Sequence, residues 1–196
     1  DHFNVRPYPE SNPVTFLLIA RMLWDKGVRE FVEAARQIKS EFSNVNFQLL
    51  GFLDVENRTA ISRIQVERWD KDGIVEYLGY TDDVREHIAF SSCVVLPSYR
   101  EGLPRTLLEA AAMGRPIIAT DVTGCREVVD HGVNGYLCKE RDANDVAEKM
   151  KDMINLSTDE RREMGLKGRK KMEREFDEKI IVQKIVDRIE SFLNAA

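Results

Sequence analysis

Short apolar runs alternate along the chain with longer segments in which apolar residues recur every three or four positions. The apolar runs, which predict buried parallel strands, are 14–20, 45–50, 75–78, 93–96, 116–119 and 135–138. The segments with helical periodicity are 27–43, 55–70, 82–90, 104–113, 124–130, 142–155, 159–174 and 178–193. This alternation predicts an α/β fold: a Rossmann-like, open parallel sheet with helices on both faces. Ligands are then expected at the carboxyl ends of the strands.

Composition and charge narrow the class of protein. The 196 residues suffice for one sizeable domain, and the 43% apolar content is ordinary for a soluble globular protein. The 34 acidic residues outnumber the 29 basic ones, which argues against a nucleic-acid partner. No apolar run approaches the roughly 20 residues that span a bilayer. The spacing of Cys93, Cys125 and Cys138 favours buried thiols in a reducing cytosol over a zinc site.

The pattern divides the chain into three parts. Residues 1–13 contain three prolines and no helical period, so they are expected to be a linker from an upstream domain. Residues 14–176 carry the strand–helix alternation and are expected to form the folded domain. Residues 177–196 are expected to form a separate C-terminal helix.

The segment 98–121 carries the densest candidate chemistry. It places Glu101 in a loop, Pro104 at the start of a helix, and Glu109 inside that helix. Proline suits the first helical position because its missing N–H would have no partner there. The unpaired amides of the first turn would face the opening beyond the preceding strand, and Glu109 would lean back toward it. Two carboxylates and a set of N–H donors around one opening suit a sugar nucleotide.

Two cations follow the first predicted strand directly. Arg21 and Lys26 lie at its carboxyl end, and Gly27 could open the next helix so that the backbone approaches a phosphate closely. Such cations can hold a diphosphate as it gains charge. Taken alone, they are more simply explained as solvation of a loop. No Gly-x-Gly-x-x-Gly follows the strand, which disfavours a dinucleotide-binding domain of the dehydrogenase type.

The order of these pieces resembles the C-terminal, donor-binding half of a family 4 retaining glycosyltransferase with the GT-B fold (glycosyl transferases group 1). The resemblance runs from Val14 to about Phe192. The matching pieces are Ala-Arg at 20–21, Lys-Gly at 26–27, Leu-Gly-Tyr at 78–80, Pro-Ser at 97–98, Glu-Gly-Leu-Pro at 101–104, Glu-Ala at 109–110, Gly-Arg-Pro at 114–116, Ala-Thr-Asp at 119–121, Gly124, Glu-Val-Val at 127–129 and Gly-Val-Asn-Gly at 132–135. In this order and spacing they are specific to the family.

The resemblance implies roles for individual residues. Arg21 and Lys26 would bind the donor diphosphate and Glu101 would contact the donor sugar, which makes these three the candidate catalytic residues. The donor-binding residues that it adds are Gly27, Tyr80, Val84, Gly102, Leu103, Pro104, Arg105, Thr106 and Glu109. Among them, Glu109 would hold the ribose hydroxyls and Tyr80 and Val84 would line the base. The expected donor is a UDP-sugar, with no cofactor and no metal ion.

The sequence also departs from the family pattern. Full-length members have an N-terminal domain that binds the acceptor, and no such domain is present in these residues. The chain is therefore expected to bind donor weakly and to transfer nothing alone, with the helix at 178–193 crossing to the missing domain. Residues 22–25 differ from the family's more common form, and Trp24 is expected to affect donor choice. The resemblance implies polysaccharide assembly, such as capsule or O-antigen, on a glycan or lipid-linked acceptor.

Two alternatives remain open at this point. One is half of a sugar-nucleotide epimerase, which would convert its substrate without an acceptor. The other is a non-catalytic module that only binds sugar nucleotides. The expected location is the cytoplasm, with peripheral association at the inner face of the membrane left open.

Overall fold

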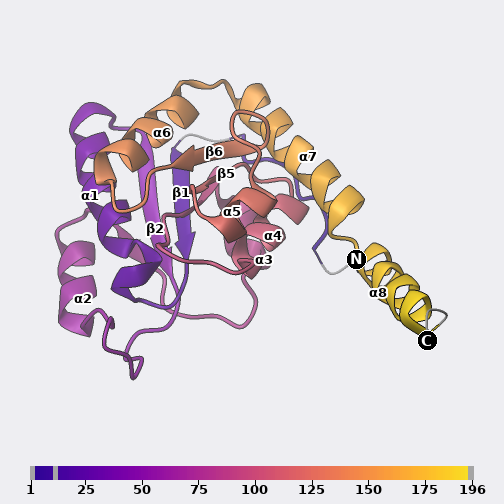
Figure 1. Cartoon of the computed structure of the whole chain (residues 1–196). Helices are drawn as coiled ribbons and strands as arrows, with labels where there is room; N and C mark the ends of the chain where they lie inside the picture. The colour runs from indigo at the N-terminus through magenta and orange to yellow at the C-terminus, as the bar shows by residue number, and fades with distance from the viewer. Residues whose placement is uncertain (1–2, 11–12, 194–196) are drawn as a thin grey trace.

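A computed structural model describes residues 3–10 and 13–193 (Figure 1). Its single sheet has six parallel strands in the order β3-β2-β1-β4-β5-β6. The strands are β1 Val14–Ile19, β2 Val45–Leu50, β3 Glu76–Tyr77, β4 Cys93–Leu96, β5 Ile117–Thr120 and β6 Gly135–Cys138. The order reverses between β1 and β4, so the loops after these two strands diverge and leave a crevice at the carboxyl edge. The predicted open parallel sheet is confirmed.

The helices cover both faces of the sheet. They are η1 Trp24–Lys26 (a 3₁₀ turn), α1 Val28–Glu41, α2 Arg63–Lys71, α3 Arg85–Phe90, α4 Arg105–Ala112, α5 Thr123–Val128, α6 Ala143–Asn155, α7 Thr158–Glu175 and α8 Glu178–Leu193. Alternation within β1 separates the two layers: Phe16 and Leu18 pack with α1, α2 and α6. Leu17 and Ile19 point to the opposite face, where α3 packs, and α4 and α5 cover β4 and β5 on that side (Figure 1).

Local sequence explains where α6 and α7 begin. The side chain of Asp142 accepts the N–H groups of Asn144 and Asp145 at the start of α6. Ser157 and Glu160 form a reciprocal capping box at the start of α7. Each cap satisfies amides that have no partner within the helix.

Several predicted helix starts are wrong, among them that of 82–90, since α3 begins only at Arg85. Residues 55–61 of the predicted helix 55–70 are not helical, because their backbone bonds to the chain after β1: Trp24 N–H donates to Thr59 O at 2.7 Å, and Ile61 N–H to Met22 O at 2.9 Å. Helix α2 therefore starts only after its cap, Ser62. Pro104 is not the first helical residue either: its ψ of 110° is extended, and α4 begins at Arg105.

Helix α8 projects from the body of the domain (Figure 1). The exposed apolar side chains along it are Val182, Ile185, Val186, Ile189 and Phe192. Their spacing of three or four residues places them in one stripe. Of the predicted linker 1–13, residues 1–2 and 11–12 lie outside the described residues. Phe3–Tyr8 contacts the domain, since the Phe3 carbonyl accepts from Arg169 and the Tyr8 hydroxyl donates to Ser92 O.

Candidate functional site

The loops after β1 and β4 meet at the carboxyl edge of the sheet. Gly27 is the N-cap of α1 and lies in the left-handed region, with φ +72°. A Cβ there would overlap the Pro97 carbonyl oxygen and lie 2.8 Å from Pro97 Cγ. The two loops are joined by Tyr99 N–H, which donates to Asp25 O at 2.9 Å. Glycine at position 27 is therefore what lets the β1 loop lie against the end of β4.

This approach brings Lys26 and Glu101 together. Lys26 Nζ donates to Glu101 Oε1 at 2.6 Å, although 75 positions separate the two residues. Their side chains are only 22% and 11% exposed, so water screens the pair incompletely. A cation and a carboxylate thus stand at the topological switch point of the sheet.

A cavity of about 190 Å³ opens beside this ion pair. Its lining residues are Ile19, Ala20, Lys26, Leu96, Glu101, Pro104, Arg105 and Thr106. Arg105 and Thr106 are the first two residues of α4, whose N–H groups have no intrahelical acceptor and carry the positive end of the helix dipole. The cavity therefore combines cationic and N–H donors with one carboxylate, which suits an anionic ligand that also carries hydroxyl groups.

A second cavity, of about 180 Å³, shares Ile19, Ala20 and Thr106 with the first. Arg21, Tyr80 and Val84 line it, as expected of residues that follow strands of one parallel sheet, whose carboxyl ends share an edge. Phe52 lines it as well, and its ring stacks on Tyr80 with centroids 3.4 Å apart. Phe52 was missed by the sequence reasoning. The available signal was an aromatic residue directly after Gly51, at the carboxyl end of a predicted strand.

Glu109, Gly102 and Leu103 do not line either cavity. Glu109 forms an ion pair with Arg105 at 3.5 Å, so it is connected to the first cavity through that residue. Gly102 lies in the loop between Glu101 and α4, and this loop packs on Gly124, where a Cβ would lie 2.6 Å from the Gly102 carbonyl carbon. Gly124 therefore helps to position Glu101.

A buried carboxylate holds a residue of the loop after β4. Glu30, in the first turn of α1, is only 5% exposed, and its Oε1 accepts the Tyr99 hydroxyl at 2.8 Å. Burial, followed by the bond to Glu30, raises the pKa of Tyr99 to about 12. The guanidinium of Arg141 lies over the Tyr99 ring, 4.6 Å from its centroid. Sequence reasoning missed this arrangement because it depends on contacts between distant segments.

Other candidate chemistry lies apart from this site. Burial raises the pKa of the Cys125 thiol to about 12, so the thiol stays neutral near Glu101. All three cysteines are buried and unpaired. Within residues 3–10 and 13–193, no group of three or more His, Cys, Asp or Glu side chains gathers as metal ligands would.

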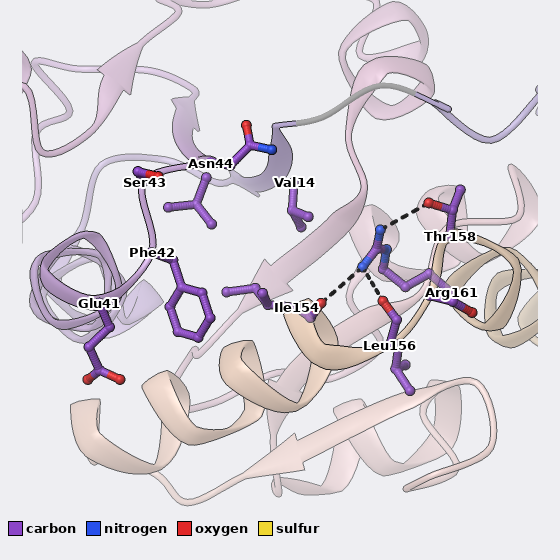
Figure 2. Close-up of a pocket in the computed structure, with 11 residues that line it drawn as sticks. Val14, Glu41, Phe42, Ser43, Asn44, Ile154, Leu156, Thr158 and Arg161 are labelled. Atoms are coloured by element: carbon purple, nitrogen blue, oxygen red, sulfur yellow. Dashed lines mark hydrogen bonds between the residues drawn. The ribbon is translucent and has the colours of Figure 1, made fainter.

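A wider groove of about 460 Å³ lies at the opposite edge of the sheet (Figure 2). It opens between the ends of α1 and α6 and the start of α7, and none of the predicted site residues lines it. Arg161 Nη1 donates there to the carbonyls of Met153, Ile154 and Leu156 at the end of α6. These bonds account for Arg161 as a helix cap.

The crevice at the carboxyl edge of a six-stranded parallel sheet is the geometry of a nucleotide-binding α/β domain. The sequence model of the glycosyl transferases group 1 family matches residues 13–155. The chain therefore belongs to the glycosyl transferases group 1 family, and its fold is that of a GT-B glycosyltransferase domain.

Individual proteins agree with this assignment. The chain is 37% identical over 184 residues to N,N'-diacetylbacillosaminyl-diphospho-undecaprenol alpha-1,3-N-acetylgalactosaminyltransferase of Campylobacter jejuni, covering 92% of this chain and 46% of that protein. The capsular polysaccharide biosynthesis glycosyltransferase CapM of Staphylococcus aureus is 29% identical, with 89% and 45% covered. HepE of Anabaena, solved with UDP, superposes with a TM-score of 0.81 at 23% identity, covering 92% and 49%. The chain thus spans about half the length of these relatives.

Proposed function

We propose that this chain binds the nucleotide-sugar donor, a UDP-sugar, of a retaining glycosyltransferase in polysaccharide or glycoconjugate biosynthesis. The observation that carries the proposal is the Lys26–Glu101 pair beside the start of α4, at the switch point of the sheet. The family membership, and the UDP bound to the structurally similar HepE, support it.

Roles follow from where the residues lie. Lys26, Arg21 and the first amides of α4 would neutralise the diphosphate, which gains negative charge as its bond to the sugar breaks. Glu101 would accept hydroxyl groups of the donor sugar, and Glu109 those of the ribose. The cavity lined by Tyr80, Val84 and Phe52 would receive the base. We further propose that these groups make a metal ion unnecessary.

The proposed reaction needs a second domain, which binds the acceptor. The bond from the anomeric carbon to the diphosphate breaks, a bond to an acceptor hydroxyl oxygen forms on the same face, and the acceptor proton passes to the departing diphosphate. The acceptor, a glycan or a lipid-linked sugar, would be held by a domain that precedes these residues in the full-length protein. The apolar stripe of α8 would pack against that domain. We propose that the present chain alone binds donor without transferring sugar.

The location of the full-length protein is also a proposal. In the described part of the chain, no helix has both the length and the apolar character needed to span a bilayer. We propose a cytoplasmic enzyme that associates with the inner face of the membrane where its acceptor is lipid-linked.

Isothermal titration calorimetry of the chain with UDP, GDP and ADP tests the proposal. We expect selective UDP binding that weakens about tenfold or more in Lys26→Ala, because a charge-assisted hydrogen bond to the diphosphate is lost. Lys151→Ala is the matched control, since Lys151 also pairs with a glutamate at 2.6 Å, but with Glu41 at the opposite edge of the sheet. Equal UDP affinity in the two variants would contradict the proposed site.

The two alternatives give different results with the full-length protein. An epimerase would change the sugar of the nucleotide without any acceptor. A non-catalytic module would bind the sugar nucleotide and leave it intact when acceptor is present. Transfer that requires both donor and acceptor supports the glycosyltransferase.

A further inference from the structure

A buried cation lies at the far end of the two helices that begin at the candidate site. Arg115 follows α4 and is 0% exposed. Among the ion pairs of the described residues, none joins Arg115 to a carboxylate. Its guanidinium instead donates to six carbonyl groups, those of Arg6, Pro7, Ile88, Ala89, Met113 and Gly114, at 2.7–3.5 Å.

These carbonyls come from three segments of the chain. Ile88 and Ala89 are in the last turn of α3, and Met113 ends α4. Carbonyl groups at helix ends carry partial negative charge, which compensates the buried guanidinium. Arg6 and Pro7 belong to residues 3–8, which precede β1 and are called the entering segment below. Arg115 therefore ties both helix ends and the entering segment to one point.

The opposite ends of the same helices line the candidate donor site. Val84, immediately before α3, lines the second cavity, and Arg105 and Thr106 start α4 beside the first. At about 1.5 Å per residue, six-residue α3 and eight-residue α4 are only about 9 and 12 Å long. Helices this short behave as rigid rods, so a shift at one end also moves the other.

Side-chain packing follows the same path. One buried cluster contains Ile19, Leu50, Ile88 and Met113, with Phe3 of the entering segment and Val84 packed against it. Ile19, Leu50 and Val84 are also lining residues of the second cavity. Contact is thus continuous from the entering segment to the wall of the proposed base site.

We propose that Arg115 is a positioning residue for the donor site. By holding the ends of α3 and α4 against the entering segment, it fixes where the two helices begin, and so where Val84 and Thr106 stand. The inference deepens the proposed function and rests on donor binding at these cavities.

Arg115→Met tests the inference, with Arg161→Met as the matched control. Arg161 is also buried, at 6% exposed, and also bonds carbonyls at a helix end, but that helix is α6 (Figure 2), whose first residues line neither candidate cavity. Both variants lose a buried guanidinium of the same kind. Only Arg115→Met removes the hydrogen bonds that link the ends of α3 and α4 to the entering segment.

Two measurements are made on each variant. Hydrogen exchange of the unliganded chain should accelerate about tenfold or more at residues 80–88 and 102–108 in Arg115→Met, and not in Arg161→Met. The dissociation constant for UDP should rise about tenfold in Arg115→Met and stay unchanged in the control. Equal exchange at these residues in both variants, or an unchanged dissociation constant in Arg115→Met, would overturn the inference.

The hydrogen-exchange measurement needs no ligand, so it tests the inference even if the wild-type chain does not bind UDP. Absence of UDP binding by the wild-type chain would contradict only the proposed function. If Arg115→Met does not fold, Arg115→Lys replaces it. Burial lowers the pKa of Arg115 to about 10, and the same burial lowers the pKa of a lysine there. Site exchange in Arg115→Lys should then rise with pH beyond the intrinsic change seen in wild type, as the ammonium loses its proton. A profile parallel to wild type contradicts the inference.

Discussion

Replacing Gly27 with alanine tests whether the two site loops must touch. Gly27 has φ +72°, and its added Cβ would overlap the carbonyl oxygen of Pro97. Pro97 directly follows β4, so its backbone cannot yield without moving the loop that carries Glu101. The substitution therefore acts on the geometry of the site while adding only one methyl group.

The structure separates the two contributions to the cost. A left-handed alanine costs about 1–2 kcal/mol. Forcing a methyl group into a filled space adds about 1–3 kcal/mol. Gly73 has nearly the same φ, +67°, but nothing lies within 4 Å of its added Cβ. Gly73→Ala should show only the strain, so Gly27→Ala should be less stable by a further 1–3 kcal/mol or so.

Urea unfolding followed by far-ultraviolet circular dichroism gives both free energies of unfolding, and calorimetry gives the UDP affinity of each folded variant. Gly27→Ala should also bind UDP more weakly than Gly73→Ala, because Lys26 is displaced from Glu101. Losses of stability that agree within about 0.5 kcal/mol would refute the close approach of the two loops.

Three further predictions concern single side chains. Burial raises the pKa of Tyr8 to about 12, so the unfolded phenol, with its ordinary pKa of 10.0, ionises first as pH rises. The stability that Tyr8 contributes below pH 10 should be lost on passing pH 12, by up to about 2–3 kcal/mol, and alkaline urea titrations of Tyr8→Phe should lack that loss. Tyr99→Phe leaves buried Glu30 without this hydroxyl donor and should lower the free energy of unfolding by about 1–3 kcal/mol, whereas a loss under 0.5 kcal/mol would mean that the bond contributes little. Ile189→Asp should change the stability of this chain by under about 0.5 kcal/mol, because the side chain is 53% exposed, yet lower the melting temperature of the full-length protein; no change there would contradict packing of α8 on the preceding domain.

The sequence by itself determined the architecture and the candidate residues. Buried parallel strands require continuous apolar runs, and helices that cover a sheet require apolar residues every three or four positions. Both patterns can be recognised from neighbouring residues in the sequence. The carboxyl ends of parallel strands share one edge, which is why Arg21, Lys26 and Glu101 could be placed together before any coordinates. The roles of these residues and of Glu109 remain predictions.

Only the tertiary structure decided how the candidate residues are arranged. Residues 55–61 carry a helical pattern, yet Thr59 and Ile61 bond to the chain after β1, because backbone groups take whichever partner the fold presents. The pairing of Lys26 with Glu101, and four of the six carbonyl groups around Arg115, join positions far apart in sequence. Local propensity holds no information about such contacts. They form only when packing has brought the segments together, and in this chain they set the shape of the site.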